Sequence, residues 1–535
     1  MPIKMVDDPE NQDDYNEKND NSGGGGRGGF NFPGGGGGGG LLSFLPLLFG
    51  LFRSKKGLVL LLIIGGLAYF LFFRQGGCMS STTGGAENII TKLFSQSGYN
   101  YNPDEFKKAS VYEGLTDDNT KNPLPEAVSL AAFAPERLNQ GEQGSCVAWS
   151  SGYAARTILE AASTRQNPDA VKFSPAFLYN NIGLDNCEGS YIQRAMEFMS
   201  KNGALPFNDF PYDPRDCSRQ ANGALIQKAQ NFKIHGFTRL TEGDGLSAFN
   251  IRAIKEHLAK DAPVVIGMMV GGSFMQGMMG QKVWHPSADD RQQVGFGGHA
   301  MCVIGYNDRL EGGAFQIMNS WGPEWGENGL AWVRYGDFKE FVREAYGVDP
   351  LPKRGAALNI PLEYNIGLIN NETRQYIPLS NAGGNVFKTT TPVKKGTRFK
   401  MEIKNSTECY IYLFASQVDN SSQVLFPYKP IHSPYCGITG YRLFPRKESM
   451  EADAVGEKDY MAIVVSTQQL DYNALNAAVN KSTAADFPGK VNEALGNTSL
   501  KSAQYGTAGA GIMSVKANNP GQNGMVVTLV EVDKN

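Results

Sequence analysis

The feature that most constrains this chain is an uncharged run from Gly57 to Phe73, with the sequence GLVLLLIIGGLAYFLFF. Its length is at the lower end of what a membrane-spanning helix needs, which is about 20 residues. Residues 1–56 precede the run, so it does not lie where a removable signal peptide would lie. The sequence therefore predicts one uncleaved transmembrane helix, a signal anchor, within a membrane-anchoring segment at residues 41–74.

Basic residues near the run predict its orientation. Arg53, Lys55 and Lys56 lie on its N-terminal side, whereas Arg74 is the basic residue that follows it directly. Positive charge tends to stay in the cytoplasm, so the N-terminus is predicted to be cytoplasmic and the chain after residue 74 to be exported. In a Gram-negative bacterium the exported part would be periplasmic. Residues 1–40, which are acidic and then glycine-rich, are predicted to form a disordered cytoplasmic tail.

Charge and composition exclude several classes of partner. The 50 Lys+Arg nearly balance the 53 Asp+Glu, and the pI is about 6.1. Nucleic-acid-binding domains are usually strongly basic, so no nucleic-acid partner is predicted. The seven cysteines include no Cys-x-x-Cys pair, and His235, His257 and His285 stand alone among unrelated residues. Neither a metal site nor a cofactor is predicted.

The chain beyond the anchor divides at DPLPKRG, residues 349–355, because prolines and charges are typical of interdomain joints. After this joint Phe399, Met401 and Ile403 alternate with charged residues, which predicts a β-strand. Further short apolar runs separated by turn residues predict a β-sandwich, and LDYNALNAAVNKS is predicted to be a helical insertion. The fold class is α+β, with a linker at 75–110, a first folded domain at 111–350 and a β-sandwich at 360–535.

Three separated segments of the first domain carry residues suited to thiol chemistry. In NQGEQGSCVAWSSGYAARTILEAA, two glycines allow a tight turn before Cys146, which is predicted to begin a helix. A helix start favours a thiolate, although a lone cysteine there is more often a buried apolar residue. His299 lies in VGFGGHAMCVIGYND before an apolar strand, and Asn319 opens NSWGPEWGENGLAWVRY. An amide can orient an imidazole, which then serves the thiol as its base.

Together these segments resemble the papain family of cysteine peptidases, on Asn-Gln-Gly followed by Gly-Ser-Cys, on GGHAMCVIGYND, and on NSWG followed by WGENG. The resemblance implies a two-lobed papain-like domain at residues 111–350 that cleaves peptide bonds through an acyl-thioester. It implies that Cys146 is the nucleophile, His299 the general acid and base, and Asn319 the residue that orients the histidine. Gln140 would be the side-chain donor of the oxyanion hole.

The resemblance also implies a set of substrate-binding residues. Gly189 and Ser190 would pair with the substrate backbone on the nonprime side of the cleft, with Tyr191 nearby. Because the family usually has glycine where Ser190 stands, the hydroxymethyl group is predicted to narrow the path of the peptide. Gly298 implies a roomy pocket floor, and Trp321 would shield the hydrogen bond between histidine and asparagine from water.

The sequence departs from the family pattern in its cysteines and before the domain. The family's cysteine before Gly-Ser-Cys is Gln143 here, and one partner of a second family bridge is Asn180. The orphaned Cys187 and Cys217 are therefore predicted to pair with each other, the alternative being two free buried thiols. No long amphipathic helix separates the anchor from the domain, so the family's inhibitory prodomain is predicted to be absent.

The C-terminal part resembles a bacterial domain of unknown function that is found appended to peptidase-like proteins, on CYIYLF, two Leu-Phe-Pro turns and AIVVS. It is expected to have a binding or positioning role, with a protein partner. The leading hypothesis for the chain is a membrane-anchored cysteine endopeptidase that acts on peptide or protein substrates and contacts the membrane through residues 57–73. The alternatives are a peptidase-fold scaffold or binding protein, and an acyl transferase that uses the same thiol.

Overall fold

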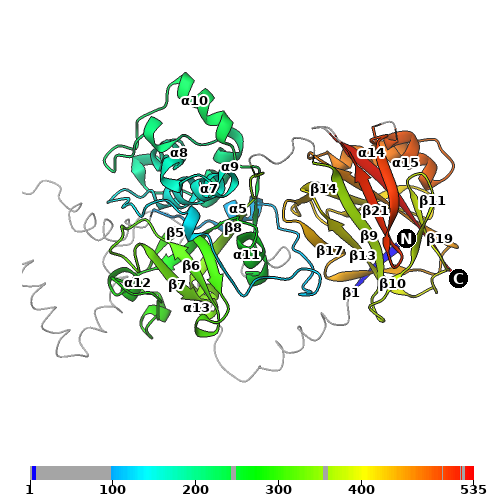
Figure 1. Cartoon of the computed structure of the whole chain (residues 1–535), viewed down its shortest axis with the longest axis horizontal. Helices are drawn as coiled ribbons and strands as arrows, with labels where there is room; N and C mark the ends of the chain where they lie inside the picture. Colours follow the sequence, from blue (N-terminus) through cyan, green and yellow to red (C-terminus); the bar gives the residue numbers. More distant parts are fainter. Residues whose placement is uncertain are drawn as a thin grey trace, which may run out of the picture. The chain divides into compact units, whose positions relative to one another are not determined.

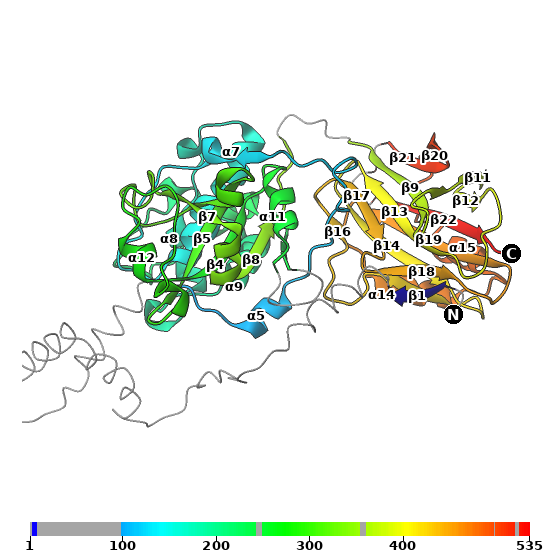
Figure 2. The ribbon, with the colours of Figure 1, turned by 90° about the horizontal axis from the view of Figure 1, so that it is seen from below.

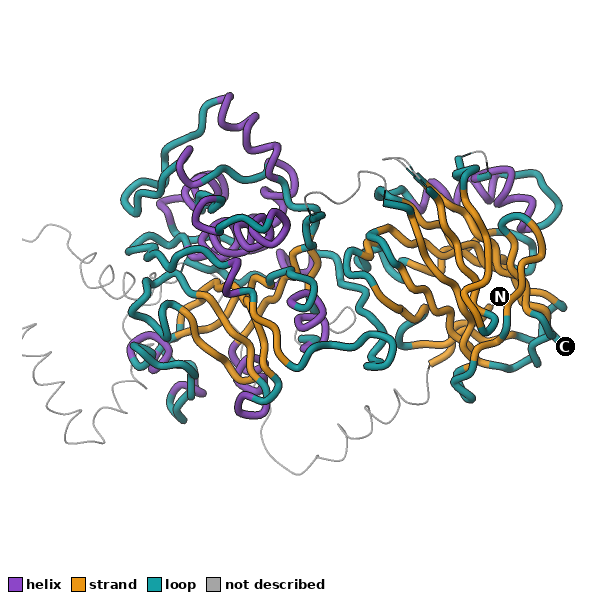
Figure 3. Tube along the Cα trace, viewed as in Figure 1, coloured by secondary structure: helices purple, strands orange, loops and turns teal. Residues whose placement is uncertain are grey.

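The computed structural model describes residues 3–7, 98–241, 249–353, 360–496, 498–518, 520 and 524–535. Residues 98–348 form an α+β domain, and residues 360–535 form a β-domain together with an N-terminal strand. Figure 3 shows that the α+β domain has one lobe of helices and one lobe of strands.

The helical lobe surrounds a long helix that begins at Cys146 (Figure 1). The lobe contains α6 (Cys146–Ala148), a π-helical segment (Trp149–Arg156), α7 (Thr157–Thr164), α8 (Pro175–Ile182), α9 (Ile192–Asn202) and α10 (Gly223–Ala229). Helix α8 begins after Ser174, whose hydroxyl accepts a hydrogen bond from the Phe177 N–H at 3.0 Å. A serine followed by proline is a common helix start, since proline fits the first turn.

The strand lobe is one antiparallel sheet with the order β3-β8-β4-β5-β6-β7, and β2 also pairs with β5. Its strands are β2 (Ala127–Ser129), β3 (Phe237–Arg239), β4 (Val264–Val270), β5 (Gly297–Asn307), β6 (Ala314–Met318), β7 (Leu330–Arg334) and β8 (Val342–Val348). Helices α11 (Ile251–Leu258), α12 (Gly272–Gln276) and α13 (Tyr335–Phe341) belong to this lobe, and α5 (Pro103–Lys108) precedes it in the chain. Strands β4 and β5 are buried almost throughout, as their apolar sequences require.

The β-domain consists of two sheets with a shared apolar core between them. One sheet has the order β1-β18-β13-β9-β21-β20 with β10 and β17 at its side, and the other has β11-β12-β22-β19-β14-β15 with β16 at its side. The strands are β1 (Ile3–Asp7), β9 (Leu362–Asn370), β10 (Tyr376–Ile377), β11 (Leu379–Gly383), β12 (Val386–Thr389), β13 (Arg398–Asn405), β14 (Cys409–Ser416), β15 (Ser422–Phe426), β16 (Tyr435–Cys436), β17 (Gly440–Phe444), β18 (Glu448–Ala452), β19 (Lys458–Ser466), β20 (Ala503–Gly509), β21 (Ile512–Ala517) and β22 (Met525–Asp533).

The alternation that predicted strand β13 is confirmed, since Phe399, Met401 and Ile403 all lie in the core between the sheets. Their charged neighbours are not exposed, however. Lys400 donates a hydrogen bond to the Arg446 carbonyl at 2.9 Å, and Glu402 forms an ion pair with Lys121 at 2.5 Å. The helical insertion is also confirmed by α14 (Tyr472–Lys481). A further helix that was not predicted, α15 (Phe487–Leu495), follows it, and both helices pack on β14, β19 and β22.

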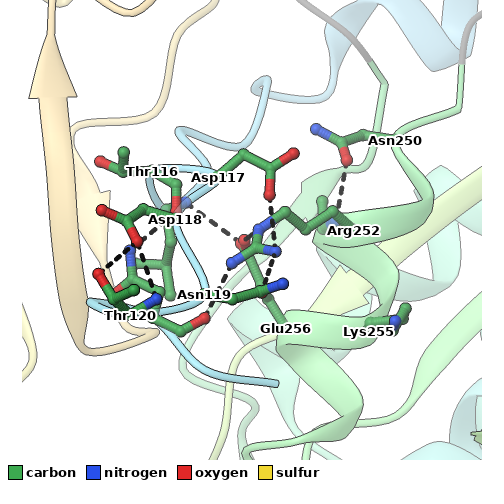
Figure 4. Close-up of polar contacts among 12 residues, drawn as sticks. Thr116, Asp117, Asp118, Asn119, Thr120, Asn250, Arg252, Lys255 and Glu256 are labelled. Carbon is green, nitrogen blue, oxygen red and sulfur yellow. Dashed lines mark hydrogen bonds and ion pairs between the residues drawn. The ribbon is translucent and has the colours of Figure 1, made fainter. Parts of the chain in front are cut away.

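A strap at residues 109–122 runs along helix α11 and strand β17 (Figure 4). The buried Glu256 carboxylate of α11 accepts hydrogen bonds from the Tyr112 hydroxyl at 3.1 Å and the Leu115 N–H at 3.2 Å. Arg252, one turn earlier, forms an ion pair with Asp117 at 2.8 Å. The strap also donates from the Thr116 N–H to the Tyr441 carbonyl at 2.8 Å, so it links the two domains through the backbone.

Two predictions about the N-terminal region can be compared with the structure. Among the residues that the structure describes, no helix is both long and apolar enough to cross a membrane, and the span predicted at 57–73 falls outside those residues. The predicted disordered tail at 1–40 needs a correction, because residues 3–7 form strand β1, which pairs antiparallel with β18 (Figure 2). Met5 packs against the core of the β-domain. The cytoplasmic N-terminus and the export of the chain after residue 74 stay predictions.

Candidate active site

Cys146 occupies the first position of the long helix, where the helix meets the central strand β5. Its side chain is completely buried, and its Sγ accepts a hydrogen bond from the Ala300 N–H at 3.4 Å. The preceding Ser145 has non-helical backbone angles, so the helix starts at the cysteine. Unpaired N–H groups at such a helix start favour negative charge on the sulfur.

His299 lies on β5 directly before Ala300, and its ring is held on two sides. Its Nε2 atom is 2.7 Å from the Asn319 Oδ1 atom, which also accepts a hydrogen bond from the Ser320 N–H at 2.8 Å. An oxygen that accepts the Ser320 bond must receive a proton from Nε2, so Nδ1 is the ring nitrogen left for proton exchange. The Trp321 indole stacks on the imidazole with centroids 4.3 Å apart. The histidine is therefore fixed in one tautomer and one orientation.

The loop before the cysteine is braced by Gln140. Its side-chain N–H donates to the Gln143 carbonyl at 2.9 Å, and its Oε1 accepts a hydrogen bond from the Ser320 hydroxyl at 2.7 Å. The Tyr212 hydroxyl donates to the Gln140 carbonyl at 2.7 Å and lies 2.7 Å from the Ser145 hydroxyl. Tyr212 thus contacts both the start of the loop, at Gln140, and its end, at Ser145.

Burial dominates the electrostatics of the thiol. Loss of solvent raises the pKa of Cys146 to about 12, and the hydrogen bonds from the Ala300 and Val147 N–H groups lower it only in part. Burial in the closed site therefore favours the thiol of Cys146 over its thiolate.

A short stretch of the chain, the cleft segment (Gly98–Asn100), covers the surface between Ser190 and His299. The Ser190 N–H donates to the Gly98 carbonyl at 2.9 Å, and its carbonyl accepts from the Asn100 N–H at 3.0 Å. On the other side, Gly98 forms an antiparallel bridge with His299. The contact is so close that a Cβ atom on Gly98 would lie 2.2 Å from the Gly144 carbonyl oxygen.

Tyr99, in the middle of the cleft segment, fills a pocket whose floor lacks side chains. A Cβ atom on Gly267 would lie 2.1 Å from the Tyr99 ring, and one on Gly298 would lie 2.7 Å from it. The Tyr99 hydroxyl lies near the buried Glu344 carboxylate but makes no hydrogen bond of ordinary geometry. Burial raises the pKa of Glu344 to about 8.

Comparison with known proteins accounts for this arrangement. Residues 131–346 match the family model described as "Papain family cysteine protease". These residues form a papain-family cysteine protease domain.

Curated relatives agree with this assignment. The chain is 28% identical over 233 residues to an uncharacterized peptidase C1-like protein of Acanthamoeba polyphaga mimivirus, covering 42% of this chain and 69% of that protein. It is 28% identical over 195 residues to mouse cathepsin K (36% and 54%) and 26% identical over 209 residues to the cathepsin B-like CP2 of Giardia intestinalis (36% and 62%). The chain thus spans 54% to 69% of the length of these three relatives.

Among solved structures, the chain is similar to xylellain, a cysteine protease from Xylella fastidiosa. The sequence identity is 25%, the TM-score is 0.39, and the match covers 48% of this chain and 97% of that chain.

The papain-family domain brings together the residues predicted from its motifs. Cys146, His299, Asn319 and Gln140 meet where the long helix faces β5, and Trp321 covers the histidine. The predicted disulfide between Cys187 and Cys217 is confirmed, with Cα atoms 6.2 Å apart.

The residues predicted to bind the nonprime side of a substrate, Gly189, Ser190 and Tyr191, differ in their contacts. Ser190 uses its backbone to bind the cleft segment, and Gly189 touches the same segment. The Ser190 hydroxyl donates to the Ile182 carbonyl at 2.9 Å, and the narrowing of the peptide path by the Ser190 side chain stays a prediction. Tyr191 precedes α9, and its ring packs against Arg194 at 5.0 Å.

Several residues at the papain-family site were missed by sequence reasoning. Tyr212, Tyr99 and Glu344 are single polar or aromatic residues in otherwise ordinary surroundings, and no motif marks them. No group of His, Cys, Asp and Glu side chains suited to a metal ion occurs within the described ranges.

Proposed function

We propose that the chain is a cysteine endopeptidase in which Cys146 attacks the peptide carbonyl and forms an acyl-thioester. The observation that carries this proposal is the placement of Cys146 at a helix start against β5, next to a histidine that is fixed by Asn319. In the reaction, Nδ1 of His299 takes the thiol proton and later gives it to the leaving amine. Gln140 and the Cys146 N–H stabilise the oxyanion.

The cleft segment restrains this activity. Ser190 and Gly298 are the backbone partners expected for a substrate, and the cleft segment uses both, with Tyr99 donating to the Gly298 carbonyl at 3.4 Å. Ser190 bonds to the residues on either side of Tyr99, in a parallel bridge. A helical prodomain is not needed for such a block, because three residues suffice to cover the cleft. Catalysis requires the segment to leave, which also returns water to Cys146 and lowers its pKa.

A peptide-turnover assay tests the proposal. The full chain and the variants Cys146→Ala, His299→Ala and Asn319→Ala are compared on a library of fluorogenic peptides. Cys146→Ala should abolish turnover, and His299→Ala should lose about 10²–10⁴-fold. Asn319→Ala should lose less, since Trp321 still holds the ring. Turnover in Cys146→Ala equal to that of the wild type would contradict the proposal. Transfer of the acyl group to an added amine in preference to water would favour an acyl transferase.

We also propose that residues 57–73 attach the protein to a membrane and that the catalytic domain lies in an exported, oxidising location. The apolar run and the disulfide between Cys187 and Cys217 support this location. Because β1 pairs with β18, residues 3–7 share it.

Strand pairing gives a test of this location, because Met5 lies opposite Met450. In a Met5→Cys, Met450→Cys double variant the two thiols should cross-link within one chain in intact cells, whereas neither single variant should do so. Absence of the cross-link would favour the cytoplasmic N-terminus predicted from the sequence.

The β-domain has a positioning or binding role in this proposal. Its resemblance to a bacterial domain appended to peptidase-like proteins supports that role, and the strap gives it a direct connection to the catalytic domain. A protein partner of the β-domain would be sought by comparing pull-downs that use the whole chain with pull-downs that use a variant in which Tyr112 of the strap is substituted.

A further inference from the structure

A second polar pocket lies outside the catalytic cleft, with a cavity of about 270 Å³. Helix α9 contributes Gln193 and Glu197 to its wall, and the β-domain contributes Tyr410 and Tyr435. Asp349, the residue after β8, also lines it. None of these residues has a role in the peptidase mechanism, so the pocket needs an explanation of its own.

Asp349 is the central residue of this pocket. Its side chain is only 4% exposed, yet none of the residues that the structure describes donates a hydrogen bond to its carboxylate. Gly236 leaves room for the carboxylate, since a Cβ atom there would lie 2.5 Å from Oδ2. Lys108 also lines the pocket, but its ammonium group is engaged by Glu105 at 2.7 Å. A buried carboxylate without an internal partner is costly and calls for a ligand that supplies donors.

Gln193 gives a second, independent sign of a missing ligand. The Gln193 side chain is only 3% exposed, and its Oε1 atom has no hydrogen-bond partner among the described residues. Its amide N–H already donates to Glu197 Oε1 at 3.0 Å, so the amide orientation is set by that bond. Gln193 and Asp349 both line the cavity, and the Gln193 Oε1 atom and the Asp349 carboxylate are both acceptors.

Charge and aromatic surface point to the same kind of ligand. The Glu408 carboxylate, which accepts a hydrogen bond from the Tyr435 hydroxyl at 3.0 Å, adds negative charge near Asp349. Burial, and then this neighbour, raise the pKa of Asp349 well above its ordinary value. The rings of Tyr410 and Tyr435 have centroids 5.0 Å apart and offer aromatic surface to a cation.

We propose that this pocket binds an organic cation, a primary ammonium or guanidinium group, which donates hydrogen bonds to the Asp349 carboxylate and the Gln193 carbonyl. Such a group satisfies both orphaned acceptors and neutralises the buried charge, and the cavity is large enough for an alkyl chain behind it. The cation can come from a free amine or from a lysine or arginine side chain. The proposal does not depend on peptidase activity.

Calorimetric titration of the full chain, carrying Cys146→Ala to prevent self-cleavage, tests the proposal with three probes. Agmatine represents a free amine, Nα-acetyl-lysine methylamide a side chain in a peptide, and Nα-acetyl-norleucine methylamide an uncharged control. At least one cationic probe should bind and the control should not. Binding of agmatine alone identifies a free amine as the ligand class, and binding of the lysine derivative identifies a side chain.

Matched variants locate the binding. Asp349→Asn should weaken the cationic probe at least about tenfold, since a hydrogen bond to a charged group is lost. Gln193→Leu should weaken it several-fold, whereas Glu457→Gln, which removes an exposed carboxylate of the β-domain, should leave it unchanged. Thermal unfolding confirms that each variant is folded. The proposal is overturned if no cationic probe binds below about 10 mM, if the uncharged control binds equally well, or if Asp349→Asn binds as tightly as its parent.

Discussion

The catalytic cleft and the Asp349 pocket both contain a buried acid on or just after strand β8, but only one of them is filled by the chain itself. Glu344 lies beneath Tyr99, which occupies the space a substrate side chain would take. Asp349, five positions later, lines a cavity, and none of the described residues donates a hydrogen bond to its carboxylate. In our account the cleft is therefore closed by a segment of the chain itself, with Tyr99 in the place of a substrate side chain, whereas the second pocket is open to a ligand from outside.

Removing the Tyr99 ring from the cleft should have the largest effect on the rate at which Cys146 is labelled. In Tyr99→Ala the ring no longer fills its pocket, and burial of such a ring is worth about 1.5–3 kcal/mol. The fraction of open cleft, and with it the rate at which a peptidyl epoxide labels the enzyme, should rise about 10–100-fold. Tyr435→Ala is the matched control from the other pocket and should leave the labelling rate unchanged. Equal labelling of wild type and Tyr99→Ala would show that the cleft segment does not close the site.

Two glycines provide a comparison of intermediate size. Gly98→Ala places a Cβ atom 2.2 Å from the Gly144 carbonyl at a positive φ of 69°, so it should release the cleft segment and raise labelling. Gly236→Ala places a Cβ atom 2.5 Å from the Asp349 carboxylate and should lower the free energy of unfolding by about 1–3 kcal/mol without changing labelling. Chemical denaturation and epoxide labelling, measured on both variants, separate the two outcomes. A reversal of the pattern would contradict the assignment of the two sites.

The pH dependence of opening should change by a smaller factor. Burial beneath Tyr99 raises the pKa of Glu344 to about 8, so the closed state holds a proton that the open, solvated state releases at lower pH. Raising the pH from about 5 to 8 should therefore favour opening. Because the thiol itself also reacts faster at high pH, the measured quantity is the labelling rate of wild type divided by that of Glu344→Gln. This ratio should rise several-fold over the range, and a flat ratio would mean that Glu344 does not report on opening.

The smallest effect is expected on stability at the second pocket. Burial raises the pKa of Asp349 above its unfolded value, so the folded state binds the proton more tightly and stability falls as pH rises above about 4. Asp349→Asn should remove this fall, and its melting temperature should exceed that of wild type by a few degrees at pH 7 but not at pH 4. An organic cation bound at the pocket should narrow the difference at pH 7. A wild-type melting temperature that rises relative to Asp349→Asn between these pH values would contradict the assignment.

Sequence reasoning brought together the candidate catalytic residues because each of them lies in a contiguous segment with a recognisable pattern. Cys146, His299 and Asn319 each stand beside glycines and tryptophans that a motif can register. Tyr99 could not be found in this way, since its role arises from its own bridge to Ser190 and from the bridge between Gly98 and His299, far away in the sequence. Asp349 was read as part of a proline-rich joint, because a carboxylate next to proline usually lies in a loop.

Strand β13 was predicted from the sequence and strand β1 was missed, because a strand can be predicted only where its own sequence shows a pattern of burial. The alternation at 399–403 revealed a strand of the sandwich, because one face of it is buried in the core. Strand β1 has only five residues in an acidic, polar context, and its partner β18 lies more than four hundred positions away. A pattern of that length does not distinguish a strand from a tail until its partner is known.

The most direct test of the account is peptide mapping of the full Tyr99→Ala chain after reaction with a peptidyl epoxide, with turnover measured in parallel. We predict that the label appears on Cys146 and not on Cys302, which is buried in β5, and that turnover falls in proportion to labelling. Label on Cys302 at an equal rate, or turnover that survives complete labelling of Cys146, would contradict the claim that Cys146 is the nucleophile of a peptidase held closed by its own chain.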